Sequence, residues 1–294
     1  MRFEGVYVAL VTPFDGSGCF DSSALSRHLS WLAGAGVAGF VPCGTTGEAP
    51  TLTEGERDEI ILLSLGVARD RGLKVIAGCG SNSTEAARRQ VLRARELGCD
   101  AALVVTPYYN KPTQPGLDAH YRCLADASDL PIVLYNVPSR TGVNLLPDTT
   151  RNLLLHPNIV GLKEASGIYG QWLELSNSVD WRERSWLAGD DDAFAVTMSL
   201  GGAGTISATA NVIPRSFVEL FSAAKAGNLA DAFRIQRAIQ GVVKAAFVES
   251  NPGPIKAALK MMARMEDGLR LPLVRPTAQS CEVMRKALVA QGVL

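Results

Sequence analysis

Residues 131–178 read PIVLYNVPSRTGVNLLPDTTRNLLLHPNIVGLKEASGIYGQWLELSNS, and this stretch contains the alternation that decides the fold. Short apolar runs at 131–137 and 159–164 have the length and the β-branched content of buried strands. Amphipathic stretches follow them, at 147–155 and 168–178, and their apolar residues recur at helical spacing. This order predicts parallel strands joined by crossover helices.

The same strand-helix unit occurs throughout most of the chain. Six further strands are expected at 5–12, 37–43, 74–79, 101–106, 186–189 and 204–208. The remaining helices between them are expected near 22–35, 53–70, 84–97, 115–127, 191–200 and 214–225. Thr53 followed by Glu56 predicts a capping box, and Pro147 and Pro214 suit first helical turns. Eight such units in a row predict a parallel sheet with both faces covered.

Eight units can close into a barrel or form an open doubly wound sheet. No GxGxxG follows the first strand, which weakens the dinucleotide-binding version of the open sheet. We therefore expect a (β/α)8 TIM barrel over residues 1–226 as the catalytic domain. The pattern after residue 226 is purely helical, near 228–247, 253–266 and 276–290, and predicts a C-terminal three-helix segment over 227–294.

Composition excludes several classes of function. The 294 residues carry 29 basic and 29 acidic side chains, and no basic cluster favours a nucleic acid or an anionic membrane as partner. The sequence has no run of about 18 apolar residues, so no transmembrane helix is expected. The apolar N-terminus is interpreted as a strand rather than a signal peptide. The small-molecule substrate and a second copy of the chain are the expected partners.

The cysteines and histidines do not form a metal site or a disulfide framework in the sequence. The six cysteines are scattered without a CxxC pair, which suits a reducing cytoplasm, and the three histidines are isolated from one another. Chemistry that depends on a histidine base or on a histidine-bound metal is therefore not expected. Cys43 is interpreted as a buried structural thiol.

Lys163 is the most informative candidate, because it continues the apolar run of the sixth strand. Side chains alternate along a strand, so Lys163 shares a face with Ile159 and Gly161. If that face lines the barrel, burial disfavours the ammonium form, and a neutral amine can attack a ketone carbon. If the strand ends earlier, Lys163 is an ordinary solvated lysine.

Polar groups follow three other strands, at the end where barrel active sites form. The loop GTTGE at 44–48 is either a plain turn or a cradle for a carboxylate. Tyr109 and Tyr135 are either packing residues or proton carriers. Arg140 is either an exposed charge or a bidentate ligand for a substrate carboxylate.

Eight segments together resemble one family. They are VALVTPF (8–14), GTTGE (44–48), VTPYYNKPTQ (105–114), LYNVPSRTG (134–142), GLKEASG (161–167), AGDD (188–191), GGAGTIS (201–207) and SNPGPIK (250–256). The chain resembles the dihydrodipicolinate synthase family of the N-acetylneuraminate lyase superfamily over essentially its whole length. The resemblance implies condensation of pyruvate with L-aspartate 4-semialdehyde, on the route to diaminopimelate and lysine.

The resemblance also implies catalytic roles. Lys163 would form an imine with pyruvate, and Tyr135 would carry protons to and from it. Thr46 would link Tyr135 to Tyr109 in a hydroxyl relay. Tyr109 would reach into the site of a neighbouring subunit, so the expected assembly is a homotetramer (a dimer of dimers) or a dimer.

Binding roles are implied in the same way. Thr45 and Thr46 would hold the pyruvate carboxylate, and the backbone at Ile206 would complete that pocket. Arg140 would bind the carboxylate of L-aspartate 4-semialdehyde. No metal and no cofactor are expected beyond the covalent imine on Lys163.

Two rival functions remain. The first is a sister lyase acting on sugar acids, against which GTTGE and Arg140 argue. The second is a non-catalytic paralogue, against which the complete set of reactive side chains argues.

One departure from the family pattern concerns regulation. Lysine-inhibited members usually carry a histidine or similar group where this chain has Arg57, close to Glu54. An arginine would repel the cationic effector, so we expect weak or absent inhibition by lysine.

Overall fold

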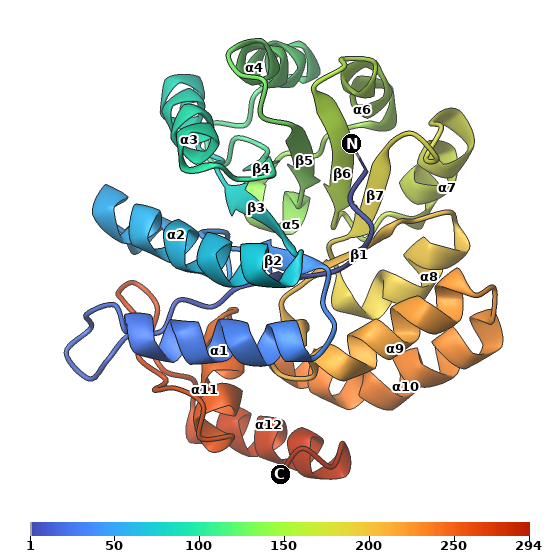
Figure 1. The fold of residues 1–294 in the computed structure, drawn as a ribbon. Coiled ribbons are helices and arrows are strands. Elements are labelled where there is room, and N and C mark those ends of the chain that lie inside the picture. Colours follow the sequence, from blue (N-terminus) through green and yellow to red (C-terminus); the bar gives the residue numbers. More distant parts are fainter. Residues whose placement is uncertain (1) are drawn as a thin grey trace. The chain divides into compact units, whose positions relative to one another are not determined.

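Eight parallel strands form a closed barrel in chain order in the computed structural model, which describes residues 2–294 (Figure 1). The strands are β1 (Gly5–Ala9), β2 (Gly39–Val41), β3 (Lys74–Gly78), β4 (Ala101–Val105), β5 (Ile132–Asn136), β6 (Ile159–Glu164), β7 (Ser185–Ala188) and β8 (Gly204–Ser207). All eight predicted strands are present, and the predicted TIM barrel is confirmed. Most of the strands are shorter than predicted, because their last apolar residues belong to the loops.

Helices connect the strands as the sequence pattern predicts. They are α1 (Ser22–Gly34), α2 (Glu54–Arg71), α3 (Thr84–Leu97), α4 (Gln114–Asp126), α6 (Pro147–Leu154), α7 (Tyr169–Ser178), α8 (Phe194–Ser199) and α9 (Pro214–Lys225). The capping box of α2 is confirmed: Thr53 accepts from the Glu56 backbone, and the Glu56 side chain accepts from the Thr53 backbone. Short 3₁₀ turns, not predicted, lie at Ala49–Thr51, Asp191–Ala193 and Thr209–Asn211.

Three helices follow residue 226: α10 (Leu229–Ala246), α11 (Gly253–Met261) and α12 (Ala278–Ala290). The predicted helices are thus present, with α11 ending earlier than expected. The division into a barrel domain at 1–226 and a separate segment at 227–294 stays a prediction. No helix among residues 2–294 has both the length and the apolar character that a membrane span requires.

The chain divides into two compact units. The first comprises the residues up to Gly5 together with Ile76–Ile206. In it the helices α3, α4, α6 and α7 pack in sequence against one another, outside the strands β4 to β7 (Figure 1). Strands β5 and β6 are buried along their whole length, as expected for strands covered on both faces.

Gly161 is required by the close approach of β6 and β7 within this unit. A Cβ atom built on Gly161 would lie 2.5 Å from the Ser185 backbone oxygen. No side chain fits there, so Gly161 allows β6 to pair in register with β7 from Gly161↔Ser185 to Glu164↔Ala188. The strand that contains Lys163 depends on this contact.

The second unit comprises Val6–Val75 and Ser207–Leu294. It therefore combines the first two strand-helix units with the C-terminal helices α9 to α12, which pack on one another. Arg264, just after α11, stacks on Trp31 of α1 with its guanidinium carbon 3.6 Å from the ring centroid. The N-terminal and C-terminal parts of the sequence are thus joined in one compact body.

Candidate active site

Lys163 and Tyr135 lie side by side at the carboxyl ends of β6 and β5. The two residues are register partners, and Lys163 Nζ is 4.1 Å from the centroid of the Tyr135 ring. Lys163 is 6% exposed and Tyr135 is 8% exposed. The expectation that Lys163 is buried is confirmed, and the alternative of a solvated lysine is wrong.

Lys163 differs in its surroundings from Lys256, the other buried lysine of the described chain. Lys256 Nζ donates to Glu48 Oε1 at 2.5 Å and to the Gly268 carbonyl at 2.6 Å. Lys163 Nζ, by contrast, has no hydrogen bond or ion pair with any of residues 2–294, and it lies over the Tyr135 ring. The Lys163 amine is therefore not engaged in a hydrogen bond with another described residue, and it is available to attack a carbonyl carbon.

Glu164, the next residue on β6, lies in a polar network that sequence reasoning missed. Its carboxylate accepts from the Ser166 backbone at 2.6 Å, from Asn136 Nδ2 at 3.2 Å and from Gln171 Nε2 at 3.3 Å. Burial raises the pKa of the Glu164 carboxyl, although the bonds from Ser166 and Asn136 act in the opposite direction. These bonds join β5, β6 and α7, and they fix the strand ends that present Tyr135 and Lys163.

Asp190, in the AGDD segment after β7, lies in the electrostatic field of Lys163. Burial is the main cause that raises the pKa of Asp190 to about 6, and the carboxylates of Asp192 and Asp191 add to it. Lys163 acts in the opposite direction. The region around Lys163 therefore contains a carboxyl group that changes charge just below neutral pH.

Tyr109 extends into solvent from the loop after β4. It is 87% exposed, and its φ of 74° lies in the left-handed region that is strained for a residue with a side chain. Its backbone N–H donates to the Thr141 carbonyl at 3.3 Å, which fixes the loop beside the segment of Arg140. An exposed aromatic side chain on a tethered, strained loop is suited to contact another molecule.

Arg140 lies on a short helix that the sequence analysis did not predict. The helix α5 (Pro138–Thr141) forms because Pro138 fixes the first φ angle, and it ends at Gly142, which adopts a φ of 74°. Arg140 is exposed and makes no ion pair with residues 2–294. Its guanidinium group is therefore free to bind a carboxylate. Ile206 is fully buried on β8.

Thr45 and Thr46 lie in the second unit, on the loop 44–48 that follows β2, which we call the GTTGE loop. Thr45 is exposed, whereas Thr46 is 3% exposed. Asn251 Nδ2 donates to Thr46 Oγ1 at 2.9 Å, and Thr12 Oγ1 donates to the Gly47 carbonyl at 2.7 Å. These two hydrogen bonds hold the loop against Thr12 and Asn251.

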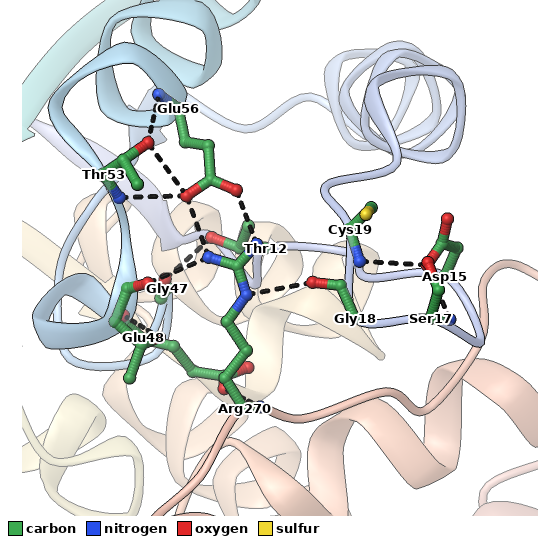
Figure 2. A network of polar contacts seen from close by, with 11 residues as sticks. Thr12, Asp15, Ser17, Gly18, Cys19, Gly47, Glu48, Thr53, Glu56 and Arg270 are labelled. Atoms are coloured by element: carbon green, nitrogen blue, oxygen red, sulfur yellow. Dashed lines mark hydrogen bonds and ion pairs between the residues drawn. The ribbon is translucent and has the colours of Figure 1, made fainter.

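Glu48 ends the GTTGE loop in the left-handed conformation, with a φ of 54°, close to Arg270 (Figure 2), and two groups hold its carboxylate. Besides Lys256, the backbone N–H of Arg270 donates to Glu48 Oε2 at 3.1 Å. The Arg270 side chain forms a bidentate pair with Glu56 and donates to the Thr51 carbonyl at 2.9 Å. Hydrogen bonding from Arg270 is the largest cause that lowers the pKa of Glu56 to about 2.

Sequence reasoning missed Asn251, Lys256 and Glu48 as members of this network. Lys256 had a recognisable pattern, because it lies among Ile255, Ala258 and Leu259 on a helix whose other core positions are apolar. A lysine at such a position requires a buried acidic partner. Glu48 was the acidic residue in the quoted motif, but nothing in the sequence paired the two.

The remaining expectations concern metals and thiols. Residues 2–294 contain no cluster of three His, Cys, Asp or Glu side chains that could hold a metal ion. Cys43 is buried, as expected, and burial raises the pKa of its thiol to about 11, which disfavours the nucleophilic thiolate.

Comparison with known proteins gives a consistent result. The model of the Dihydrodipicolinate synthetase family matches residues 2–291. The chain is 44% identical over 292 residues to 4-hydroxy-tetrahydrodipicolinate synthase from Thermodesulfovibrio yellowstonii, covering 99% of each protein.

Solved structures with the same fold include two with a bound small molecule. The chloride-inhibited dihydrodipicolinate synthase from Acinetobacter baumannii complexed with pyruvate is 41% identical, with a TM-score of 0.96 over 99% of this chain and 100% of that one. The enzyme from Cyanidioschyzon merolae with lysine bound is 38% identical, with a TM-score of 0.96 over 99% of both chains.

Proposed function

The chain belongs to the dihydrodipicolinate synthetase family, and we propose from this premise that it condenses pyruvate with L-aspartate 4-semialdehyde, as 4-hydroxy-tetrahydrodipicolinate synthases do. One observation supports the chemistry above all others. Lys163 is a buried amine that makes no hydrogen bond or ion pair with residues 2–294, and its Nζ lies over the Tyr135 ring, 4.1 Å from the ring centroid. This is the environment that a Schiff-base lysine requires.

The reaction follows from the electronics of the imine. The Lys163 amine attacks the keto carbon of pyruvate, and water leaves. The imine then withdraws electrons, so a methyl proton can be removed to give an enamine, whose carbon attacks the aldehyde. The amine of the second substrate finally displaces Lys163 and closes the ring. Tyr135 is the nearest proton carrier, and a placed carrier accelerates each transfer by about 10²–10⁴-fold.

The binding roles are proposals as well. Thr45, Thr46 and the backbone at Ile206 hold the pyruvate carboxylate, and Arg140 holds the carboxylate of the semialdehyde. Thr46 also passes the proton between Tyr135 and Tyr109, and its single hydroxyl hydrogen serves one role at a time: it points to the carboxylate when pyruvate binds and to a tyrosine during the relay. Exchange of the methyl hydrogens of pyruvate in D₂O distinguishes the relay role from the binding role. Each threonine is replaced by valine in turn. Loss of the relay threonine should slow exchange more than it weakens pyruvate binding.

Borohydride trapping tests the Schiff base directly. Wild-type protein incubated with pyruvate and reduced should gain a mass adduct that maps to the Lys163 peptide. Lys256 is the internal control, because its buried amine is occupied by Glu48 and Gly268. An adduct on Lys256, or wild-type turnover in Lys163→Ala, would overturn the assignment.

The acceptor aldehyde tests the substrate. Pyruvate consumption should be fast with L-aspartate 4-semialdehyde and slow with N-acetylmannosamine or glyceraldehyde. Arg140→Lys keeps the charge but loses the bidentate geometry, and it should raise the KM for the semialdehyde far more than the KM for pyruvate. Fast consumption with a sugar aldehyde would instead identify a sister lyase.

A second copy of the chain is the proposed partner, in a dimer or a homotetramer. The exposed, tethered Tyr109 supports this proposal. If Tyr109 acts in the neighbouring subunit, Tyr109→Phe and Lys163→Ala are inactive alone, and hybrid dimers of the two regain activity at one of their two sites. Equal activity before and after subunit exchange would refute a shared site.

We propose no metal and no organic cofactor, because the imine itself supplies the electron sink. Turnover should therefore survive exhaustive dialysis against a chelator. We propose a cytoplasmic location, because the six cysteines are scattered along the sequence without a CxxC pair.

A further inference from the structure

The segment 250–256, SNPGPIK, contacts the GTTGE loop through two side chains that have no role in the proposed chemistry. Asn251 Nδ2 lies 2.9 Å from Thr46 Oγ1, and Lys256 Nζ lies 2.5 Å from Glu48 Oε1. Both contacts are buried, and each joins residues more than 200 positions apart in the sequence. The segment is therefore placed to determine how the loop presents its threonines.

We infer that Asn251 is a positioning residue that makes the Thr46 hydroxyl a hydrogen-bond donor to the pyruvate carboxylate. A hydroxyl group has one hydrogen and two lone pairs. The amide of Asn251 occupies a lone pair of Thr46, so the hydrogen must point to another acceptor. Residues 2–294 provide none for Thr46 Oγ1. A carboxylate accepts only, and it is the complementary partner.

The two contacts have different tasks. Lys256 fixes the backbone of the loop through Glu48, and Lys256 is itself held by the Gly268 carbonyl and by the ring of Phe14, 4.3 Å from Nζ. Asn251 fixes the direction of one hydrogen. Its own Oδ1 is buried without a hydrogen-bond partner. A buried unpaired acceptor costs about 1–3 kcal/mol of stability. The hydrogen bond that Asn251 donates to Thr46 offsets part of this cost.

This inference rests on the proposed function, and the experiment separates the two. Asn251→Ala removes the directing amide, and we expect the KM for pyruvate to rise about tenfold while kcat changes about twofold at most, which corresponds to one charge-assisted hydrogen bond. Asn251→Asp keeps the shape but turns the donor into an acceptor that takes the Thr46 hydrogen. Its KM for pyruvate should rise further, on the order of 100-fold.

A double-mutant cycle tests whether Asn251 acts through Thr46. In a Thr46→Val background the hydroxyl is absent, so adding Asn251→Ala should change the KM for pyruvate less than twofold. Asn228→Ala is the matched control, because Asn228 caps α10 in the same unit through its side chain. It should lower the melting temperature without changing the KM for pyruvate.

Three results would overturn the inference. A wild-type KM for pyruvate in Asn251→Ala would show that the amide directs nothing. A full tenfold effect on top of Thr46→Val would show that Asn251 acts by another route. Absence of a borohydride-trapped pyruvate adduct in the wild-type protein would remove the proposed function and this inference together, whereas the first two results leave the proposed function intact.

Discussion

Replacing Lys256 by methionine would remove the cation from the most deeply buried ion pair of the described chain. The Lys256 side chain is 0% exposed, and that of Glu48 is 1% exposed. Methionine fills nearly the same volume, so the main change is electrostatic. Glu48 would keep only the Arg270 backbone N–H as a partner for its carboxylate.

The magnitude follows from the cost of an uncompensated buried charge. Breaking a buried ion pair from one side costs about 3–5 kcal/mol. The remaining bond from Arg270 places Lys256→Met at the lower end, about 3 kcal/mol. For a chain of this size the melting temperature should fall by about 6–12 °C. Adding Glu48→Gln removes the orphaned charge and should bring stability back to within about 1–2 kcal/mol of wild type.

The assay is thermal and urea unfolding of the two single variants and the double variant, followed by circular dichroism. Lys260→Met is the matched control on the same helix, because Lys260 is 46% exposed and its pairs with Glu266 and Asp267 face solvent. It should cost less than about 1 kcal/mol. A fall of less than about 2 °C in Lys256→Met, or a double variant no more stable than that single variant, would refute the reasoning.

Three further predictions concern pH, packing and regulation. Burial lowers the pKa of His28 from 6.5 to about 4. The neutral form of His28 therefore stabilises the fold fully above pH 6.5, and this contribution is lost as the pH falls toward 4. His28→Gln should flatten the decline of melting temperature between pH 6.5 and 4, and an unchanged slope would contradict this. Gly161→Ala forces a Cβ to 2.5 Å from the Ser185 oxygen and should lower the free energy of unfolding by at least about 1–3 kcal/mol. Gly170 has open space around it, so Gly170→Ala should not destabilise the protein. Equal melting temperatures for the two variants would argue against the clash. Submillimolar lysine should leave turnover with both substrates unchanged because of Arg57, and strong inhibition would show this expectation to be wrong.

The fold could be predicted because its determinants are local. A strand or a helix of this barrel is recognised from the period of its apolar residues, and its ends from caps such as Thr53 with Glu56. Short features without a period were missed: α5 needs only Pro138 to start and Gly142 to end it. Four residues are too few for a hydrophobic pattern.

The candidate site was predicted in part. Lys163 was recognisable as a lysine in a buried strand, and its burial is confirmed. Its proximity to Tyr135 depends on the register between β5 and β6, which includes an irregularity at Ile132 and Val133. A shift of one residue would have turned the two side chains to opposite faces. Neither sequence period nor composition determines that register.

The sequence by itself determined the eight strand-helix units, the helical C-terminal part and the position of a buried lysine in the sixth strand, because each depends on residues close together in the chain. Only the tertiary structure decided which distant groups meet. Asn251 reaches Thr46 across 205 positions and Lys256 reaches Glu48 across 208. Such contacts depend on how the helices after β8 pack against the loop after β2. Packing joins surfaces rather than neighbouring residues, so a buried charge identifies the need for a partner without identifying the partner.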